Sequence, residues 1–154
     1  MLAPAELTRA FRARGLKVTP QRQLLFTLLH DNETHPTVEA LFATASKLMP
    51  GISLRTVYQT LNDLAAMGEL QVLQSAGGST RFDPNMAEHH HAQCDRCGEL
   101  HDVYVDDIDR LQVRNLDGFQ AERARIVFGG LCAACQSKSN KKKTTENTTL
   151  KDRR

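Results

Sequence analysis

Hydrophobic residues in the first half of the chain recur at the three- and four-residue spacing of amphipathic helices. Three of these stretches follow a residue that favours a helix start, namely Thr19 before Pro20, Thr37 and Ser53. The pattern predicts four helices, over residues 4–14, from Thr19 through Leu29, from Thr37 to Leu48, and from Ser53 to just before Gly68.

Two short segments after these helices, residues 69–74 and 79–83, are expected to form strands joined by a turn at Ala76-Gly77-Gly78. Helices followed by a hairpin are the order of a winged helix-turn-helix, and a generic helical domain with a hairpin is the alternative. The polar face of the fourth helix favours the winged helix, because its side chains suit base edges, phosphates and thymine methyl groups. That face carries Arg55, Thr56, Tyr58, Gln59 and Asn62.

The pattern changes after Asp83. Segments 89–94, 99–105 and 119–128 are expected to be strands, residues 107–116 a helix, and the last cysteine pair the start of a short helix. The fold class is therefore predicted as α+β. We expect a winged-helix DNA-binding domain at 1–83, a hinge at 84–88, a small α/β dimerisation and metal-binding domain at 89–139, and a disordered basic tail at 140–154.

Composition and charge narrow the function. The 154 residues contain no apolar run approaching the roughly 20 that a membrane helix needs, and no signal-peptide pattern, so a cytoplasmic protein without membrane contact is expected. The net charge is +2, but residues 140–154 hold six basic and two acidic groups, and the other 139 residues hold 14 basic and 16 acidic groups. DNA binding must then depend on local placement of cations. The tail itself is either a solubilising end or a nonspecific DNA contact.

The four cysteines form two C-x-x-C pairs separated by 34 residues: Cys94, Cys97, Cys132 and Cys135. Without an export signal, disulfides are not expected. Four thiolates complete a tetrahedron and leave no open position, which indicates a structural zinc site. A redox-active C-x-x-C is the alternative.

Three consecutive histidines, 89–91, stand beside the first cysteine pair, with Asp83 before them and Asp102 after them. In a strand, residues two apart face the same side, so His89 and His91 can bind one metal ion while His90 points away. Imidazole and carboxylate ligands suit iron, manganese or zinc, which indicates a regulatory metal site. The alternative is a chance run of surface histidines or the remnant of a tag. His35, in the loop before the third helix, has no assigned role on its own.

In this order, the motifs resemble those of the ferric uptake regulator (Fur) family of metal-dependent repressors. The matching stretches are residues 16–22, 35–37, 53–58, 81–83, 89–98 and 130–135. The resemblance covers about residues 5–138 and leaves the tail outside.

The resemblance implies a homodimer that binds double-stranded operator DNA. It also implies a structural Zn(II) held by the four cysteines and an Fe(II) or Mn(II) site joining both domains. Carried over by position, the regulatory ligands are His35, Asp83, His89, His91 and Asp102. Lys17 matches a minor-groove contact and Tyr58 a thymine contact, so the DNA-binding residues are expected to be Lys17, Arg55, Thr56, Tyr58 and Gln59. The family often has Arg after that tyrosine, so Gln59 is a departure.

Two further features bear on function within the family. Peroxide-sensing (PerR-like) members resemble this chain in having Asp at the positions of Asp83 and Asp102, where iron sensors usually have Glu. In them, peroxide reacts at bound Fe(II) and a ligating histidine is oxidised; the matching residues are His35 and His89. A second metal site of many relatives is expected to be absent or weak, because residues 121–126 contain no histidine.

The sequence therefore predicts a peroxide-sensing repressor. A repressor of iron, manganese or zinc homeostasis without peroxide sensing is the alternative. A zinc-stapled interaction domain that does not bind DNA stays open. An enzyme is not expected, because hydrolase and deaminase zinc motifs are lacking.

Overall fold

The computed structural model describes residues 1–74, 78–122 and 124–138, and the chain divides into two compact units, Met1–Glu88 and His89–Arg154. The expected tail at 140–154 lies outside the described residues, as does most of the expected turn at 76–78. No helix in the described part of the chain is long and apolar enough to cross a membrane.

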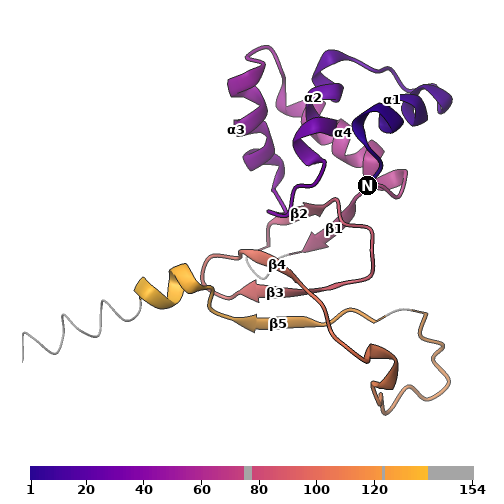
Figure 1. Ribbon diagram of the computed structural model, residues 1–154, viewed down its shortest axis with the longest axis vertical. Helices are drawn as coiled ribbons and strands as arrows, with labels where there is room; N and C mark the ends of the chain where they lie inside the picture. The colour runs from indigo at the N-terminus through magenta and orange to yellow at the C-terminus, as the bar shows by residue number, and fades with distance from the viewer. Residues whose placement is uncertain (75–77, 123, 139–154) are drawn as a thin grey trace, which may run out of the picture. The chain divides into compact units, whose positions relative to one another are not determined.

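The first unit consists of four helices and a hairpin (Figure 1). Its elements are α1 (Pro4–Ala13), α2 (Pro20–Leu29), α3 (Val38–Leu48), α4 (Leu54–Ala66), β1 (Gln71–Gln74) and β2 (Thr80–Asp83). The predicted caps are confirmed: the side chains of Thr19, Thr37 and Ser53 each accept a hydrogen bond from a backbone N–H in the first turn. Gly68 follows α4 with φ of +75°, a conformation in which a residue without Cβ is favoured.

One hydrophobic core joins the four helices and the hairpin of the first unit. Its fully buried members include Leu7 and Phe11 of α1, Phe26 of α2 and Leu61 of α4. The rings of Phe11 and Phe26 meet edge to face, with centroids 4.8 Å apart. β1 and β2 pair antiparallel, and this hairpin contributes Phe82 to the same core.

The second unit is built on a three-stranded sheet in the order β4-β3-β5, so that β3 is central (Figure 1). The strands are β3 (His90–Cys94), β4 (Leu100–Val103) and β5 (Val127–Gly130). β3 pairs antiparallel with β4 and parallel with β5. The expected short helix at the last cysteine pair is confirmed: it comprises residues 133–138, directly after Cys132.

Two predicted elements of the second unit are wrong. Residues 107–116 contain only a short 3-10 helix, η1 (Ile108–Arg110), although their apolar residues have helical spacing. Leu111, Val113 and Leu116 are exposed in the single chain, so no packing supports a longer helix. The strand expected at 119–128 begins only at Val127, where the pairing with β3 starts opposite His91.

The buried helical face of the first unit gives a direct stability test. Leu61→Ala removes a fully buried side chain and is expected to lower the free energy of unfolding by about 2–5 kcal/mol. Leu48→Ala, at a position that is 64% exposed, is the matched control and should change it by less than roughly 0.5 kcal/mol. Denaturant titration followed by helical circular dichroism reports on the first unit, which contains α1–α4. Equal effects of the two substitutions would contradict this core.

Candidate metal centres and nucleic-acid surface

The four cysteines of the second unit come together as predicted. Their Sγ atoms lie within 4.8 Å of one another, and those of Cys97 and Cys132 are 3.7 Å apart. Two sulfurs bound to one tetrahedral zinc at about 2.3 Å lie about 3.8 Å apart, so the cluster fits zinc. All four are free thiols.

Backbone hydrogen bonds fold the cysteine loops. The amide of Gly98 donates to the carbonyl of Cys94 at 2.8 Å, and Gly98 adopts φ of +70° to close this turn. The Arg96 guanidinium donates to the carbonyl of Cys135 at 2.8 Å and so links the first cysteine pair to the second. This hydrogen bond holds the two cysteine pairs together independently of any bound metal.

The thiols differ in acidity. Hydrogen bonds from backbone amides, that of Cys132 first, lower the pKa of Cys94 to about 6. A side-chain hydrogen bond with Glu99 raises the pKa of Cys132 to about 12. Because zinc binds thiolates, metal binding must release protons, and acid competes with it.

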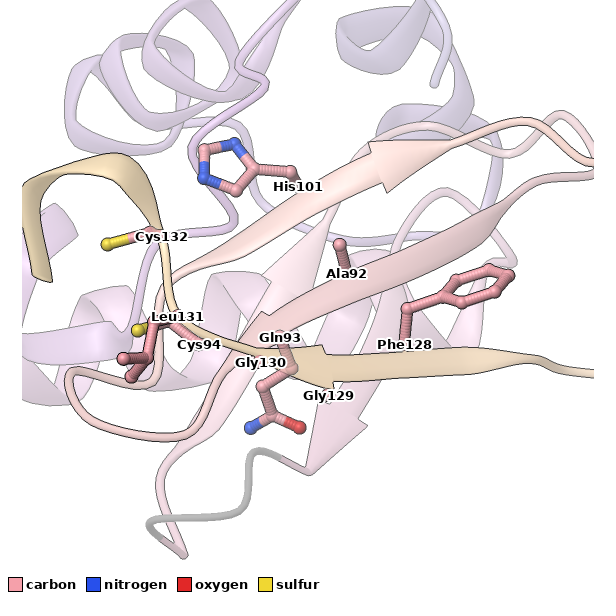
Figure 2. Close-up of a pocket in the computed structure, with 9 residues that line it drawn as sticks. All are labelled: Ala92, Gln93, Cys94, His101, Phe128, Gly129, Gly130, Leu131 and Cys132. Atoms are coloured by element: carbon pink, nitrogen blue, oxygen red, sulfur yellow. The ribbon is translucent and has the colours of Figure 1, made fainter. Parts of the chain in front are cut away.

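A hollow of about 160 Å³ lies beside the cysteine cluster. Figure 2 shows Cys94 and Cys132 at one end and Phe128 of β5 at the other. His101 also lines the hollow; it is exposed, and its Nε2 lies 3.4 Å from Oε1 of Glu99. This places His101 apart from Asp102, in agreement with the strand alternation expected for β4.

A second cluster of the same unit combines His89, His91 and Asp102. Strand register creates it, because His91 on β3 is directly opposite Asp102 on β4. The Nε2 atoms of the two histidines are 3.1 Å apart, and they lie 3.5 and 3.8 Å from Oδ1 of Asp102. Two imidazole nitrogens bound to one ion at about 2.1 Å would lie about 3.0–3.4 Å apart, so the cluster fits a divalent metal.

The first unit contains a pair of the same chemistry. His35 and Asp83 are both buried, with Nε2 of the imidazole 3.7 Å from Oδ1 of the carboxylate. His35 has φ of +48°, an uncommon conformation for a residue other than glycine. Backbone strain of this kind often accompanies a functional site.

Strand β2 holds the His35 loop in that conformation. The Arg81 guanidinium donates to the carbonyl of His35 at 3.0 Å, and the amide of Phe82 donates to the carbonyl of Pro36 at 3.0 Å. Asp83 follows on the same strand. Sequence reasoning missed Arg81 as a positioning residue, although it stands in the quoted 81–83 stretch.

The five predicted DNA-binding residues occupy the surface of the first unit. Three of them, Lys17, Thr56 and Gln59, line one hollow of about 420 Å³. Tyr58 lines a separate hollow between α3, α4 and the hairpin, and Arg55 is exposed at the start of α4. The helix that carries four of the five is therefore accessible along one face.

Glu39 on α3 is a neighbour of Tyr58 that sequence reasoning missed. The Tyr58 hydroxyl donates to Oε1 of Glu39 at 3.2 Å. The charge of Glu39 raises the pKa of Tyr58 above its usual value, since it opposes a second negative charge beside it. A hydrogen bond from the backbone of Glu39 and one from the side chain of Thr37 lower the pKa of the Glu39 carboxyl group, which favours its charged form.

The first unit has the capped helices and the hairpin of a winged helix. The chain also carries one cluster of thiols and others of imidazole and carboxylate groups. Together these features define a metal-responsive winged-helix regulator. The model of the "Ferric uptake regulator family" matches residues 13–128. The chain belongs to this family, whose members are transcriptional regulators rather than enzymes.

Relatives and solved structures agree with this family. The chain is 32% identical over 136 residues to the peroxide-responsive repressor PerR of Staphylococcus aureus (strain Mu50), covering 86% of this chain and 91% of the relative. It is 28% identical over 137 residues to PerR of Staphylococcus epidermidis, covering 88% and 91%. The ferric uptake regulator Fur of Helicobacter pylori has the same fold, with a TM-score of 0.72 at 24% identity over 86% of this chain and 90% of that one.

The ionisation of Tyr58 tests the contact with Glu39. Glu39→Gln removes the charge, so the pKa of Tyr58 is expected to fall back toward its usual value. The chain has two tyrosines and no tryptophan, so tyrosinate absorbance in a Tyr104→Phe background follows Tyr58 alone. Glu33→Gln, at an exposed acid, is the matched control and should leave the midpoint in place. An unchanged midpoint in Glu39→Gln would contradict the contact.

Proposed function

We propose that this protein is a metal-dependent repressor that binds operator DNA as a homodimer in the cytoplasm and senses peroxide through an Fe(II) or Mn(II) site. The observation that carries the proposal is the cluster of His89, His91 and Asp102, created by strand register beside the cysteine cluster. It supplies the mixed nitrogen and oxygen ligands of an exchangeable divalent metal, separate from the all-sulfur ligands of a structural one.

In this proposal His35 and Asp83 complete the ligand set of the same ion. Asp83 and His89 are separated by five residues, a length of chain that spans at most about 20 Å. Both clusters offer the same chemistry, a histidine beside an aspartate. The family resemblance assigns all five residues to one site.

A site with ligands from both units would couple metal binding to DNA binding. Metal occupancy would fix the orientation of each winged helix relative to its dimerisation unit. The separation of the two DNA-reading helices in a dimer must match the spacing of operator half-sites. Metal and DNA would therefore favour the same conformation, and each would raise the affinity for the other.

The proposed DNA surface is α4 with the loop before α2. Arg55, Thr56, Tyr58 and Gln59 would face the major groove, and Lys17 would contact the backbone or minor groove. The support is the exposure of four of them, all but Thr56, and the hollow that Lys17, Thr56 and Gln59 share. Few placed cations suffice, in keeping with a net charge of only +2.

The peroxide part of the proposal depends on the aspartates at 83 and 102 and on the PerR relatives. Bound Fe(II) would promote a two-electron oxidation of one ligating imidazole by peroxide, in which one peroxide oxygen is added to the ring and the other leaves as water; Mn(II) would not promote this reaction. His35 and His89 are the ligands proposed to be oxidised. Loss of one imidazole ligand would weaken the site and release DNA.

Removal of zinc should disrupt the second unit. The Cys132→Ser variant has one zinc ligand fewer and therefore a lower affinity for the metal. It is expected to lose the metal during dialysis against a chelator, and the sheet of the second unit should unfold with that loss. Ser137→Ala, in the adjacent helix, is the control and should keep the metal. In the native chain, release should be faster near pH 6 than near pH 8, because protons compete for thiolates. Metal content and circular dichroism report both effects; zinc retained by Cys132→Ser would contradict the site.

Peroxide sensing is tested on protein loaded anaerobically with Fe(II) or Mn(II). Both forms should bind an operator duplex, and peroxide should abolish binding by the Fe(II) form alone. Mass spectrometry should then find an added oxygen on the peptide of His35 or His89. His89→Ala should weaken metal binding at least roughly tenfold, whereas His101→Ala, outside the cluster, should not.

Two outcomes separate the alternatives. DNA binding that follows metal concentration and ignores peroxide would replace the proposal by a metal-homeostasis repressor. Failure of either metal-loaded form to select any duplex from a randomised pool would remove DNA binding altogether and favour a zinc-stapled interaction domain.

A further inference from the structure

Arg22 is a buried charged residue within the DNA-binding unit. It lies in the first turn of α2, and its side chain is 10% exposed. Three neighbours surround the guanidinium. Nη2 donates to Oδ2 of Asp63 at 2.6 Å, Nη1 donates to the carbonyl of Lys17 at 3.2 Å, and the group lies 5.2 Å from the ring centre of Phe11.

These contacts join segments far apart in the sequence. Asp63 belongs to α4, Lys17 to the loop between α1 and α2, and Phe11 to α1. A buried charge is tolerated when it is paired and hydrogen-bonded, and the planar guanidinium can serve two acceptors in different directions. A lysine ammonium at this position has no such fork. The geometry is therefore specific to arginine.

The two hydrogen-bonded partners of Arg22 are the two parts of the proposed DNA surface. One guanidinium nitrogen fixes the backbone from which the Lys17 side chain extends. The other fixes α4, whose Thr56 and Gln59 line the same hollow as Lys17. Arg22 also lines that hollow but is buried, whereas Lys17 is exposed.

We propose that Arg22 is a positioning residue for DNA recognition, which holds the Lys17 backbone at a fixed distance from the recognition helix α4. Arg22 itself does not contact DNA in this arrangement. It acts through Lys17, so that the Lys17 side chain meets a DNA phosphate while the side chains of α4 meet the base edges. This inference rests on the proposed DNA-binding function.

The test asks whether the effect of Lys17 depends on Arg22. Metal-loaded protein is titrated with a duplex selected by the wild type from a randomised pool, at several salt concentrations. In the wild type, Lys17→Ala should weaken binding roughly tenfold and reduce the salt slope by about one, as expected for a lost phosphate contact. In an Arg22→Lys background, which keeps the charge, Lys17→Ala should cost less than about threefold and leave the slope nearly unchanged.

A purely structural role predicts a different result. The Arg22→Lys substitution would then lower thermal stability, but Lys17→Ala would have its full effect in both backgrounds, and this outcome overturns the proposal. Arg12→Lys, at an exposed arginine of α1, is the matched control and should leave the Lys17→Ala effect intact. If Arg22→Lys does not fold, the double variant Arg22→Met/Asp63→Leu replaces the pair by apolar side chains of similar size and serves as the background.

Failure of this inference is distinguishable from failure of the proposed function. A wild type that selects a duplex while Lys17→Ala changes nothing keeps the repressor and overturns the role of Arg22. A wild type that selects no duplex overturns both.

Discussion

Strand β3 is the constraint on which both metal clusters depend. It is central in its sheet, and its two-residue alternation separates His91 from His90 while Cys94 ends the same strand. Pairing with β4 brings Asp102 opposite His91, and pairing with β5 brings Gly130 opposite Cys94, two residues before Cys132. A shift of one residue in either register would move a ligand to the opposite face and dismantle one cluster. Five residues of strand therefore specify two kinds of metal chemistry.

The two clusters differ in how they can respond to their surroundings. The sulfur cluster has four soft ligands, and a hydrogen bond from Arg96 to Cys135 connects its two halves. A metal held there would stabilise a small sheet that buries few apolar side chains. The histidine clusters offer imidazole and carboxylate ligands, which bind divalent metals less firmly than four thiolates do and exchange them more readily. A regulator needs one site that is always filled and one whose occupancy varies. The separation of thiol and imidazole ligands provides this division.

Much of this organisation could be predicted from the sequence because local signals agreed with the final packing. Capping residues marked the starts of α2, α3 and α4, and strand alternation placed His89 with His91. Prediction failed where apolar residues remain exposed in the described part of the chain. Ile108 and Leu111 are three residues apart, as in a helix, but Leu111, Val113 and Leu116 are exposed, so the pattern alone formed no longer helix. The strand expected at 119–128 pairs with β3 only from Val127 onward in the described part of the chain.

Positioning residues were the part of the site that spacing could not reveal. Arg22 stands in a helix start and Arg81 in a strand, and neither position carries a pattern that distinguishes a buried arginine from an exposed one. Their importance comes from acceptors distant in the sequence: Asp63 lies 41 residues from Arg22, and His35 lies 46 residues from Arg81. In both cases the guanidinium binds a backbone carbonyl, of Lys17 or His35, next to a side chain proposed to act. Holding the backbone fixes where the acting side chain begins and leaves its tip available to DNA or metal.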